Sequence, residues 1–251
     1  MDLYITGAGI SSESGIPTFR GTDGFWTIGS KNYTPQEMAT RSMYKNNPGQ
    51  FLLWYYKRFI KYRNAKPNKV HEYLVDKYLI TQNIDGLDFK AGNKNYIAIH
   101  GNLHKITLYH DQNDIVDIQD APWDDIEKEC PDINDNTKLK SILLDIFKVS
   151  KSTLKPEKMK SLKPFVLLFD EFYTDNYKIN KAYNWMNSAT KFIFLGTSFS
   201  VNITEMALKK AINNNAKVEI VDPKPINLNI ENVIYHKMTA LEFIMSKKIN
   251  S

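Results

Sequence analysis

Residues 1–20, MDLYITGAGISSESGIPTFR, carry the strongest local indication of how this chain folds. Residues 3–6 are a short apolar run of the kind found in buried strands, and the run ends at Gly7 and Gly9. Neither glycine carries a Cβ, so a strand that ends here allows a phosphate to approach the backbone closely. Ser12 replaces the third glycine of the full dinucleotide-binding pattern. Taken alone, the glycine pair is equally well explained as an ordinary turn after a strand.

Further apolar runs indicate more buried strands. They are separated by segments of helical periodicity and occur at residues 78–81, 96–99, 164–169, 191–195 and 218–221. Buried strands that alternate with helices are typical of a parallel sheet covered by helices on both faces. The sequence therefore predicts an α/β protein whose core is a doubly wound, Rossmann-like parallel sheet.

Capping residues mark where helices begin. Thr34 and Thr239 are each followed three residues later by glutamate, which is the spacing of a capping box. Asn47 and Asn68 each precede a helical pattern and are expected to cap it. Between residues 103 and 160 the pattern is weaker. We expect a strand near 103–108 and a polar loop at 132–140.

Glycines and polar residues follow most of the predicted strands. They are residues 7–9, residues 82–85, His100, residues 196–198 and Asp222. In a doubly wound sheet, ligands bind at the carboxyl ends of the strands, so these groups are expected to converge. The sequence thus predicts a dinucleotide-binding site at this edge of the sheet.

Longer motifs around these positions resemble the sirtuin family of NAD-dependent protein deacylases. They occur in the family's order and span almost the whole chain: GAGISSESGIPTFR at 7–20, GFW at 24–26, TQNIDGL at 81–87 with Ala91 and Gly92, HGNL at 100–103, and GTS at 196–198 followed by Val201. The resemblance implies that NAD is cleaved between nicotinamide and ribose. ADP-ribose would pass to the acyl oxygen of a modified lysine, giving free lysine, nicotinamide and O-acyl-ADP-ribose.

The resemblance also implies which residues bind NAD. They are Gly7, Ala8, Gly9, Ser11, Pro17, Phe19, Arg20, Gln82, Asn83, Ile84, Asp85, His100, Gly196, Thr197, Ser198, Asp222 and Ala240. Phe19 and Arg20 would cover the nicotinamide ribose. Thr197 and Ser198 would bind phosphate or ribose hydroxyls. Asp222, where the family often has asparagine, would accept hydrogen bonds from the adenosine ribose.

Three of these residues are candidates for catalysis. His100 would act as general base on the ribose hydroxyls, a role that suits histidine because its unperturbed pKa lies near physiological pH. Asn83 would orient the ribose or the reacting water, and Asp85 would bind the nicotinamide carboxamide. Asparagine and aspartate also favour turns, so these two residues would signify little without His100 and the glycines at 7–9.

A tyrosine and an arginine indicate which acyl group is removed. Tyr55 and Arg58 are three residues apart on a predicted helix, so their side chains share one face. The pair resembles the Tyr-x-x-Arg pair of sirtuins that remove succinyl, malonyl or glutaryl groups, because an arginine fork binds a carboxylate. Acetyl is also included among the acyl groups that we expect the protein to remove. Residues 54–58 are rich enough in aromatic and basic side chains for the spacing to arise by chance.

The acyl-lysine peptide is expected to bind by strand addition. The resemblance places it against Phe169, Glu171 and Val201. Asp170 stands where the family has glycine, and Asp88 stands where it often has histidine. Asp170 adds a side chain beside the expected peptide.

The chain has a single cysteine, Cys130, whereas most sirtuins hold a structural zinc ion with four. We therefore expect no structural zinc, no other metal site, and a small module that is held by packing. Residues 1–251 are expected to form one catalytic domain, with the Rossmann-like core at about 1–30, 78–102 and 164–251. The inserted module would comprise a helical part at about 31–77 and residues 103–163.

Composition limits the partners that we expect. The 251 residues carry a formal net charge of +5, but the lysines and arginines form no long block that would indicate nucleic-acid binding. No apolar run is long enough to cross a bilayer, and the N-terminus enters a strand without a leader-like segment. We expect a cytoplasmic monomer that binds no membrane and acts on an acyl-lysine protein or peptide.

Two other functions are compatible with the same pocket. Water or another acceptor in place of the peptide would give NAD hydrolysis or ADP-ribosyl transfer. The missing zinc cysteines and Asp170 motivate this alternative. The second alternative is a nucleotide sensor without catalytic activity, and the presence of His100, Asn83 and Asp85 argues against it.

Overall fold

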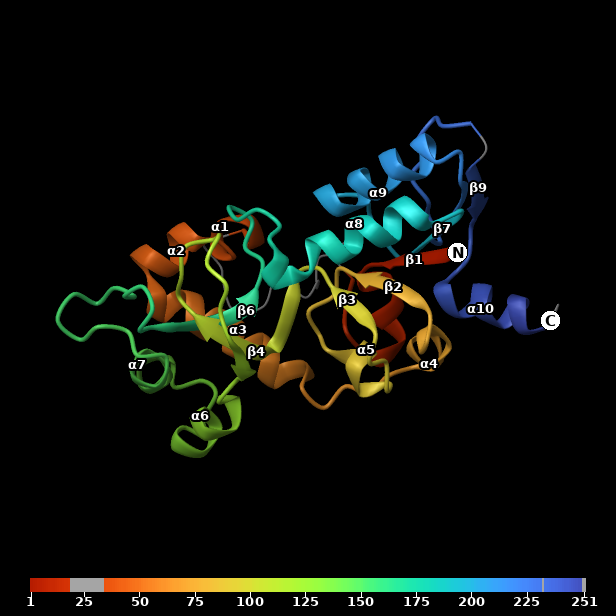
Figure 1. Ribbon diagram of the computed structural model, residues 1–251. Helices are drawn as coiled ribbons and strands as arrows, with labels where there is room; N and C mark the ends of the chain where they lie inside the picture. Colours follow the sequence, from red (N-terminus) through yellow and green to blue (C-terminus); the bar gives the residue numbers. More distant parts are fainter. Residues whose placement is uncertain (19–33, 232, 250–251) are drawn as a thin grey trace. The chain divides into compact units, whose positions relative to one another are not determined.

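The computed structural model (Figure 1) describes residues 1–18, 34–231 and 233–249. The chain divides into two compact units. The first unit comprises Met1–Gly21, Ala65–Ile99 and Lys178–Ser251. The second comprises Thr22–Asn64 and His100–Tyr177.

The first unit is built on a six-stranded parallel sheet. In spatial order its strands are β3 (Tyr96–Ala98), β2 (Tyr78–Thr81), β1 (Asp2–Thr6), β7 (Lys191–Leu195), β8 (Lys217–Val221) and β9 (Val233–His236). The strand order reverses between β1 and β7, and ligands of doubly wound sheets bind outside the carboxyl ends of the strands at this switch point. The predicted fold class is confirmed.

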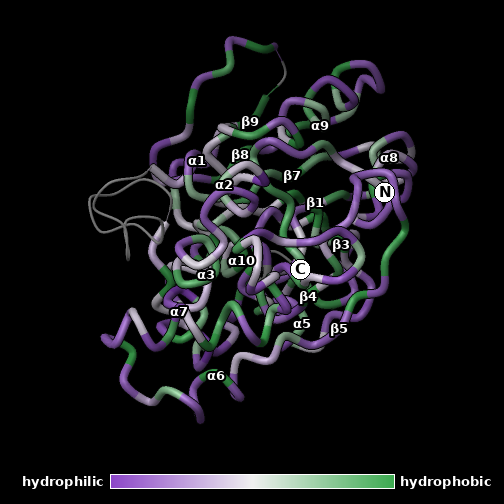
Figure 2. Tube along the Cα trace, turned by 90° about the vertical axis from the view of Figure 1, so that its left-hand side faces the viewer, coloured by the Kyte–Doolittle hydropathy of each residue, from purple (hydrophilic) through white to green (hydrophobic). Residues whose placement is uncertain are grey.

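Helices cover this sheet. They are α4 (Lys69–Leu74), α5 (Leu87–Lys90), α8 (Ile179–Ser188), α9 (Asn202–Asn213) and α10 (Ala240–Ile249). Strand side chains alternate between the two faces of a sheet, so Tyr4 and its neighbour Ile5 point to opposite sides. Tyr4 packs with Leu74 of α4 and Phe243 of α10. Figure 2 shows the hydrophobic colouring along β7, whose apolar run is buried on both sides.

The second unit contains an antiparallel sheet of three strands in the order β5 (Ile118–Asp120), β4 (Gly101–Leu108) and β6 (Leu162–Val166). Its helices are α1 (Pro35–Met38), α2 (Arg41–Asn46), α3 (Pro48–Tyr62), α6 (Trp123–Glu129) and α7 (Asn136–Ile146). Helix α3 packs against α2, α6, α7 and β4, and most of its side chains are buried. Trp123, predicted to be core, is 1% exposed and lies against Phe59 and Phe147.

The prediction that residues 164–169 form a strand of the parallel core is wrong. The observed strand is Leu162–Val166, and it pairs antiparallel with β4 in the second unit. An apolar run indicates a buried strand, but it does not specify the strand with which it pairs. Residues 164–177 accordingly belong to the second unit, and residues 65–77, expected in the small module, belong to the first.

Local signals placed some elements well and missed others. The capping boxes at Thr34 and Thr239 are formed, and Asn47 and Asn68 cap their helices. The loop expected at 132–140 is wrong in its second half, because Asp135 caps α7 through the Lys138 N–H. Elements α2, α5, α6, β5 and β9 were not predicted. No helix among the described residues is long and apolar enough to cross a membrane.

Candidate functional site

The glycines after β1 touch the glycine after β7. The Gly9 N–H donates to the Gly196 carbonyl at 2.9 Å, and the Gly7 N–H donates to the Leu195 carbonyl at 3.1 Å. A Cβ on Gly9 would lie 2.6 Å from Gly196 Cα, which is closer than real Cβ contacts come. Gly196 has a φ of +58°, which favours glycine. The glycines therefore allow the carboxyl ends of the two strands that flank the switch point to meet.

A 3-10 helix, Ala8–Ser14, follows the first glycine, and it carries Ser11 into a buried polar cluster. The Ser11 hydroxyl donates to Asp85 Oδ2 at 2.7 Å. Asn83 Nδ2 donates to the Gly7 carbonyl at 3.1 Å and to Ser11 Oγ at 3.2 Å. The structure thus brings together three predicted residues, Ser11, Asn83 and Asp85, from the ends of β1 and β2.

His71 completes this cluster, and the sequence analysis did not assign it to the site. It is fully buried on α4, with Nε2 3.5 Å from Ser11 Oγ. The Asn68 N–H donates to His71 Nδ1 at 3.3 Å, which leaves the ring proton on Nε2. Burial lowers the pKa of His71 to about 4, so the ring is neutral near pH 7. The Asn68-x-x-His71 capping spacing was a signal that could have identified it.

Two carboxyl groups, Asp85 of the cluster and Asp88, have raised pKa values. Burial raises the pKa of Asp85, opposed by hydrogen bonds from the Leu87 N–H and the Ser11 hydroxyl. Asp88 is 2% exposed, and burial together with the charge of Asp85 raises its pKa to about 7. Oδ1 of Asp88 has no hydrogen-bond partner among the described residues. Near neutral pH Asp88 is therefore part protonated.

Other predicted residues of the first unit border the same strand ends. Gln82 Nε2 donates to Thr197 Oγ1 at 3.1 Å, which joins the end of β2 to the loop after β7. Ser198 Oγ lies 2.7 Å from Ser200 Oγ. Asp222 directly follows β8, and its Oδ1 accepts from the Lys224 N–H at 2.8 Å.

The remaining residues that were predicted to bind NAD or peptide lie in the core, at a helix start, in half-buried positions or outside the described residues. Ala240 begins α10 and packs in the core, 7% exposed. Val201 caps α9, and Pro17 and Ile84 are half-buried. Phe19, Arg20 and the residues at 24–26 lie outside the described residues, so their expected roles stay predictions.

His100 begins the second unit. It directly follows Ile99, whose N–H donates to the Thr81 carbonyl at 3.0 Å. Its own carbonyl accepts from the Leu167 N–H at 3.0 Å. Its Nε2 lies 3.0 Å from the Tyr173 hydroxyl. The candidate base is thus held at the start of β4.

Tyr55 and Arg58 lie on α3, as predicted, and both are at most 2% exposed. The Arg58 guanidinium stacks on the Trp54 ring at 3.3 Å and donates to the Trp54 carbonyl at 2.8 Å. Burial lowers the pKa of Arg58 to about 9, an effect that Tyr55 opposes. Burial raises the pKa of Tyr55 well above its ordinary value, and Arg58 opposes that shift. The two groups therefore share one buried environment.

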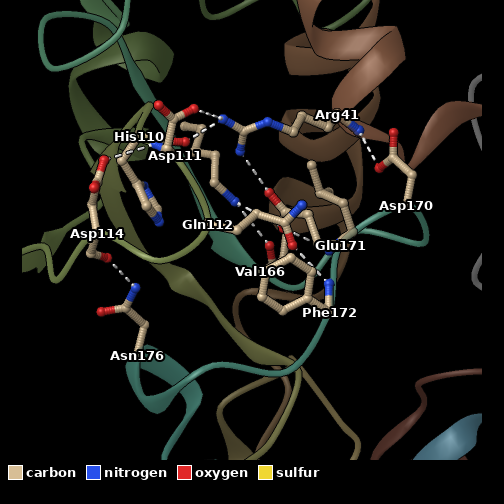
Figure 3. A network of polar contacts seen from close by, with 12 residues as sticks. Arg41, His110, Asp111, Gln112, Asp114, Val166, Asp170, Glu171, Phe172 and Asn176 are labelled. Atoms are coloured by element: carbon tan, nitrogen blue, oxygen red, sulfur yellow. Dashed lines mark hydrogen bonds and ion pairs between the residues drawn. The ribbon is translucent and has the colours of Figure 1, made fainter.

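The segment expected to bind peptide contains an ion cluster that consists of Arg41, Lys163 and Glu171. Figure 3 shows Arg41 and Glu171 of this cluster. Glu171 is paired with Arg41 at 3.0 Å and with Lys163 at 3.5 Å. It also accepts from the Leu168 N–H at 3.0 Å. Its carboxylate is therefore engaged within the unit, and its expected contact with substrate stays a prediction.

Asp170 and Phe169 flank this cluster differently. The Asp170 carboxylate accepts from the N–H groups of Arg41 and Ser42 at 2.6 and 3.0 Å, at the first turn of α2. This capping contact gives Asp170, which stands where the family has glycine, a structural role. Phe169 is 45% exposed and lies in a turn, so its ring is accessible to a ligand.

Within residues 1–18, 34–231 and 233–249, no three His, Cys, Asp or Glu side chains are grouped so as to hold a metal ion. Cys130 is buried, and its thiol donates to the Asp132 carbonyl at 3.4 Å.

Known proteins resemble this chain over most of its length. The NAD-dependent protein deacylase 1 of Caldanaerobacter subterraneus subsp. tengcongensis is 34% identical over 254 residues, which cover 98% of this chain and 91% of that protein. The NAD-dependent protein deacylase of Aquifex aeolicus is 32% identical over 230 residues, covering 88% and 83% of the two chains.

Solved structures of Sir2 homologues also resemble this chain over its whole length. The crystal structure of a Sir2 homologue in complex with NAD has a TM-score of 0.73 at 26% identity, covering 100% of this chain and 90% of the other. A Sir2 homologue variant bound to ADP-ribose has a TM-score of 0.72 at 26% identity, covering 99% and 90%. Residues 7–203 match the Sir2 family itself. This chain belongs to the Sir2 family.

Proposed function

We propose that the protein is an NAD-dependent protein-lysine deacylase. The observation that carries the proposal is the cluster of Ser11, Asn83 and Asp85, which lies at the carboxyl ends of β1 and β2 next to the contact between Gly9 and Gly196. The relatives described above carry the name of this activity. A parallel sheet places its ligand at this point.

The residues of the first unit fit a dinucleotide. The glycines keep the backbone bare where a pyrophosphate would approach, and a Cβ at Gly7 or Gly9 would collide with the 196–197 loop. Hydroxyl and amide groups of Thr197, Ser198 and Gln82 border the same strand ends. These residues, with Ala8, Pro17, Ile84, Asp222 and Ala240 at the periphery, would hold NAD.

Each polar side chain has a role in this proposal. NAD supplies the nicotinamide–ribose bond that is broken and the ribose that accepts the acyl group. Asp85, fixed by the Ser11 hydroxyl and the Leu87 N–H, would accept from the nicotinamide carboxamide. Asn83, fixed by the Gly7 carbonyl, would orient the ribose or the reacting water. His100 would take a proton from a ribose hydroxyl.

Tyr55 and Arg58 support an acidic acyl group as the preferred substrate. A buried guanidinium that stacks on Trp54 presents a rigid fork, and such a fork binds a carboxylate with paired hydrogen bonds. A succinyl, malonyl or glutaryl chain carries that carboxylate, whereas an acetyl group does not.

The acyl preference is tested by turnover on succinyl-lysine and acetyl-lysine peptides. Arg58→Met should lower the succinyl rate by tenfold or more relative to the acetyl rate, because a charged hydrogen bond contributes about 1.5–3 kcal/mol. Lys61→Met, which removes an exposed charge from the same helix, is the control. An unchanged ratio in Arg58→Met, with a folded variant, contradicts the assignment.

Hydrolysis of NAD, or transfer of ADP-ribose to another acceptor, is the alternative. The observation that favours it is Asp170, whose carboxylate lies beside the expected peptide segment and is held there by α2. Mass spectrometry of products from NAD, with and without a succinyl-lysine peptide, separates the two functions. Peptide-dependent nicotinamide release with O-succinyl-ADP-ribose supports deacylation. Free ADP-ribose without peptide supports the alternative.

A further inference from the structure

A tyrosine that the sequence analysis did not assign contacts the candidate base. Tyr173 Oη lies 3.0 Å from His100 Nε2. The two rings are nearly parallel, with an interplanar angle of 16° and 5.9 Å between centroids. A phenol hydroxyl keeps its proton near neutral pH and can donate it to an imidazole nitrogen that carries none. The contact therefore involves Nε2, the ring nitrogen farther from the backbone.

Contacts on both sides of Tyr173 set its position. Immediately before it, the Phe172 N–H donates to Gln112 Oε1 at 2.7 Å. Shortly after it, Asn176 Nδ2 donates to the Asp114 carbonyl at 2.8 Å. Figure 3 shows both contacts beside the ion cluster, which holds the preceding residue of the segment, Glu171. The tyrosine is thus carried by a segment that is tied to the 112–114 loop at two points.

The backbone of His100 is held with similar closeness. Its carbonyl accepts from the Leu167 N–H, and the next residue, Gly101, pairs with Val166. Gly101 has a φ of +84°, and a Cβ there would lie 2.1 Å from the Phe165 carbonyl oxygen. Both partners of the His100–Tyr173 contact therefore sit on constrained backbone, and the fold of the second unit dictates their distance.

We propose that Tyr173 is a positioning residue for His100: its hydroxyl donates to Nε2 and holds the ring in the orientation and tautomer in which Nε2 carries no proton. A general base must present a nitrogen in that state. A ribose hydroxyl would replace the Tyr173 hydroxyl at the same nitrogen, so one neutral hydrogen bond is exchanged for another. The inference rests on the proposed function, in which His100 is the base.

The test is Tyr173→Phe, which removes only the hydroxyl. The matched control is Tyr177→Phe, which removes a hydroxyl from a buried tyrosine of the same segment whose ring stacks on Phe165. Two-bond ¹H–¹⁵N NMR of the histidine rings reports which nitrogen of His100 carries the proton. Peptide-dependent nicotinamide release gives kcat/KM. We expect Tyr173→Phe to lose the single tautomer of His100 and to lower kcat/KM about two- to tenfold, the worth of one neutral hydrogen bond.

The outcomes separate this inference from the function beneath it. A Tyr173→Phe protein with the wild-type tautomer and wild-type kcat/KM overturns the positioning role. A higher kcat/KM than wild type also overturns it, because the hydroxyl would then obstruct the base. An equal loss in Tyr177→Phe indicates a general packing effect and overturns it too. If the wild type releases no nicotinamide, the proposed function fails, while the NMR comparison still decides whether Tyr173 sets the tautomer.

Discussion

Replacing Glu171 by glutamine is expected to destabilise the second unit strongly. The Glu171 side chain is 4% exposed and contacts Arg41 at 3.0 Å and Lys163 at 3.5 Å, and Lys163 itself is 1% exposed. Glutamine has nearly the same shape but no charge, so it leaves the Lys163 ammonium buried without its carboxylate. Removing one partner of a buried ion pair costs about 3–5 kcal/mol. For a chain of this size, that loss corresponds to a fall in melting temperature of roughly 6–20 °C.

The dependence on pH follows from the sign of the pKa shift. Burial alone would raise the pKa of Glu171, but Lys163, the Leu168 N–H and Arg41 outweigh burial and lower it. A carboxyl group with a lowered pKa in the folded state stabilises the protein above its unfolded pKa, which is about 4.3. That stability is lost as the pH falls through the folded pKa. The difference between wild type and Glu171→Gln should therefore be largest near pH 7 and shrink below about pH 4.

The assay is urea or thermal unfolding between pH 3.5 and 7.5. Asp111→Asn is the control, because Asp111 contacts Arg41 at 4.0 Å in the same network but its side chain is 60% exposed. An exposed pair contributes little to stability because solvent screens the two charges. A loss in Glu171→Gln no larger than in Asp111→Asn, or a difference between wild type and Glu171→Gln that stays constant down to pH 3.5, would refute the reasoning.

Two further predictions concern the first unit. Gly9→Ala places a Cβ 2.6 Å from Gly196 Cα, and because this neighbour is backbone, the 196–197 loop would have to move. Calorimetry should therefore find ADP-ribose binding weakened at least tenfold. An unchanged affinity would show that the two loops separate easily. Asp88→Asn removes a carboxyl whose pKa is raised to about 7. Because a raised carboxyl pKa costs the wild type stability as the pH rises from about 4 to about 7, the variant should gain roughly 2–4 kcal/mol relative to wild type between pH 5 and pH 8. Unfolding curves at the two pH values check this, and equal differences at both would contradict it.

Some of the fold and site could be predicted because the signals are local. The run at residues 3–6, the glycines after it and the capping boxes at Thr34 and Thr239 each encode their structure within a few residues. Once the strands are known to be parallel, their carboxyl ends must share one edge, so the approach of residues 7–9 to residues 82–85 followed from the sequence. His71 was missed because its spacing from Asn68 indicates only the start of a helix, whereas its contact with Ser11 joins residues far apart in the chain.

The sequence did not determine which distant segments pair with one another. The apolar run near 164 indicated a strand, and only the tertiary structure decided that Leu162–Val166 pairs with Gly101–Leu108 rather than with the parallel core. The same is true of Arg41 with Glu171, and of His100 with Tyr173, because their contacts join residues far apart in the chain. Local periodicity and turn chemistry thus determined most strands of the parallel sheet, several helix starts and the position of the strand-end site. The partners of buried charges and of the candidate base depend on packing, which no short stretch of sequence encodes.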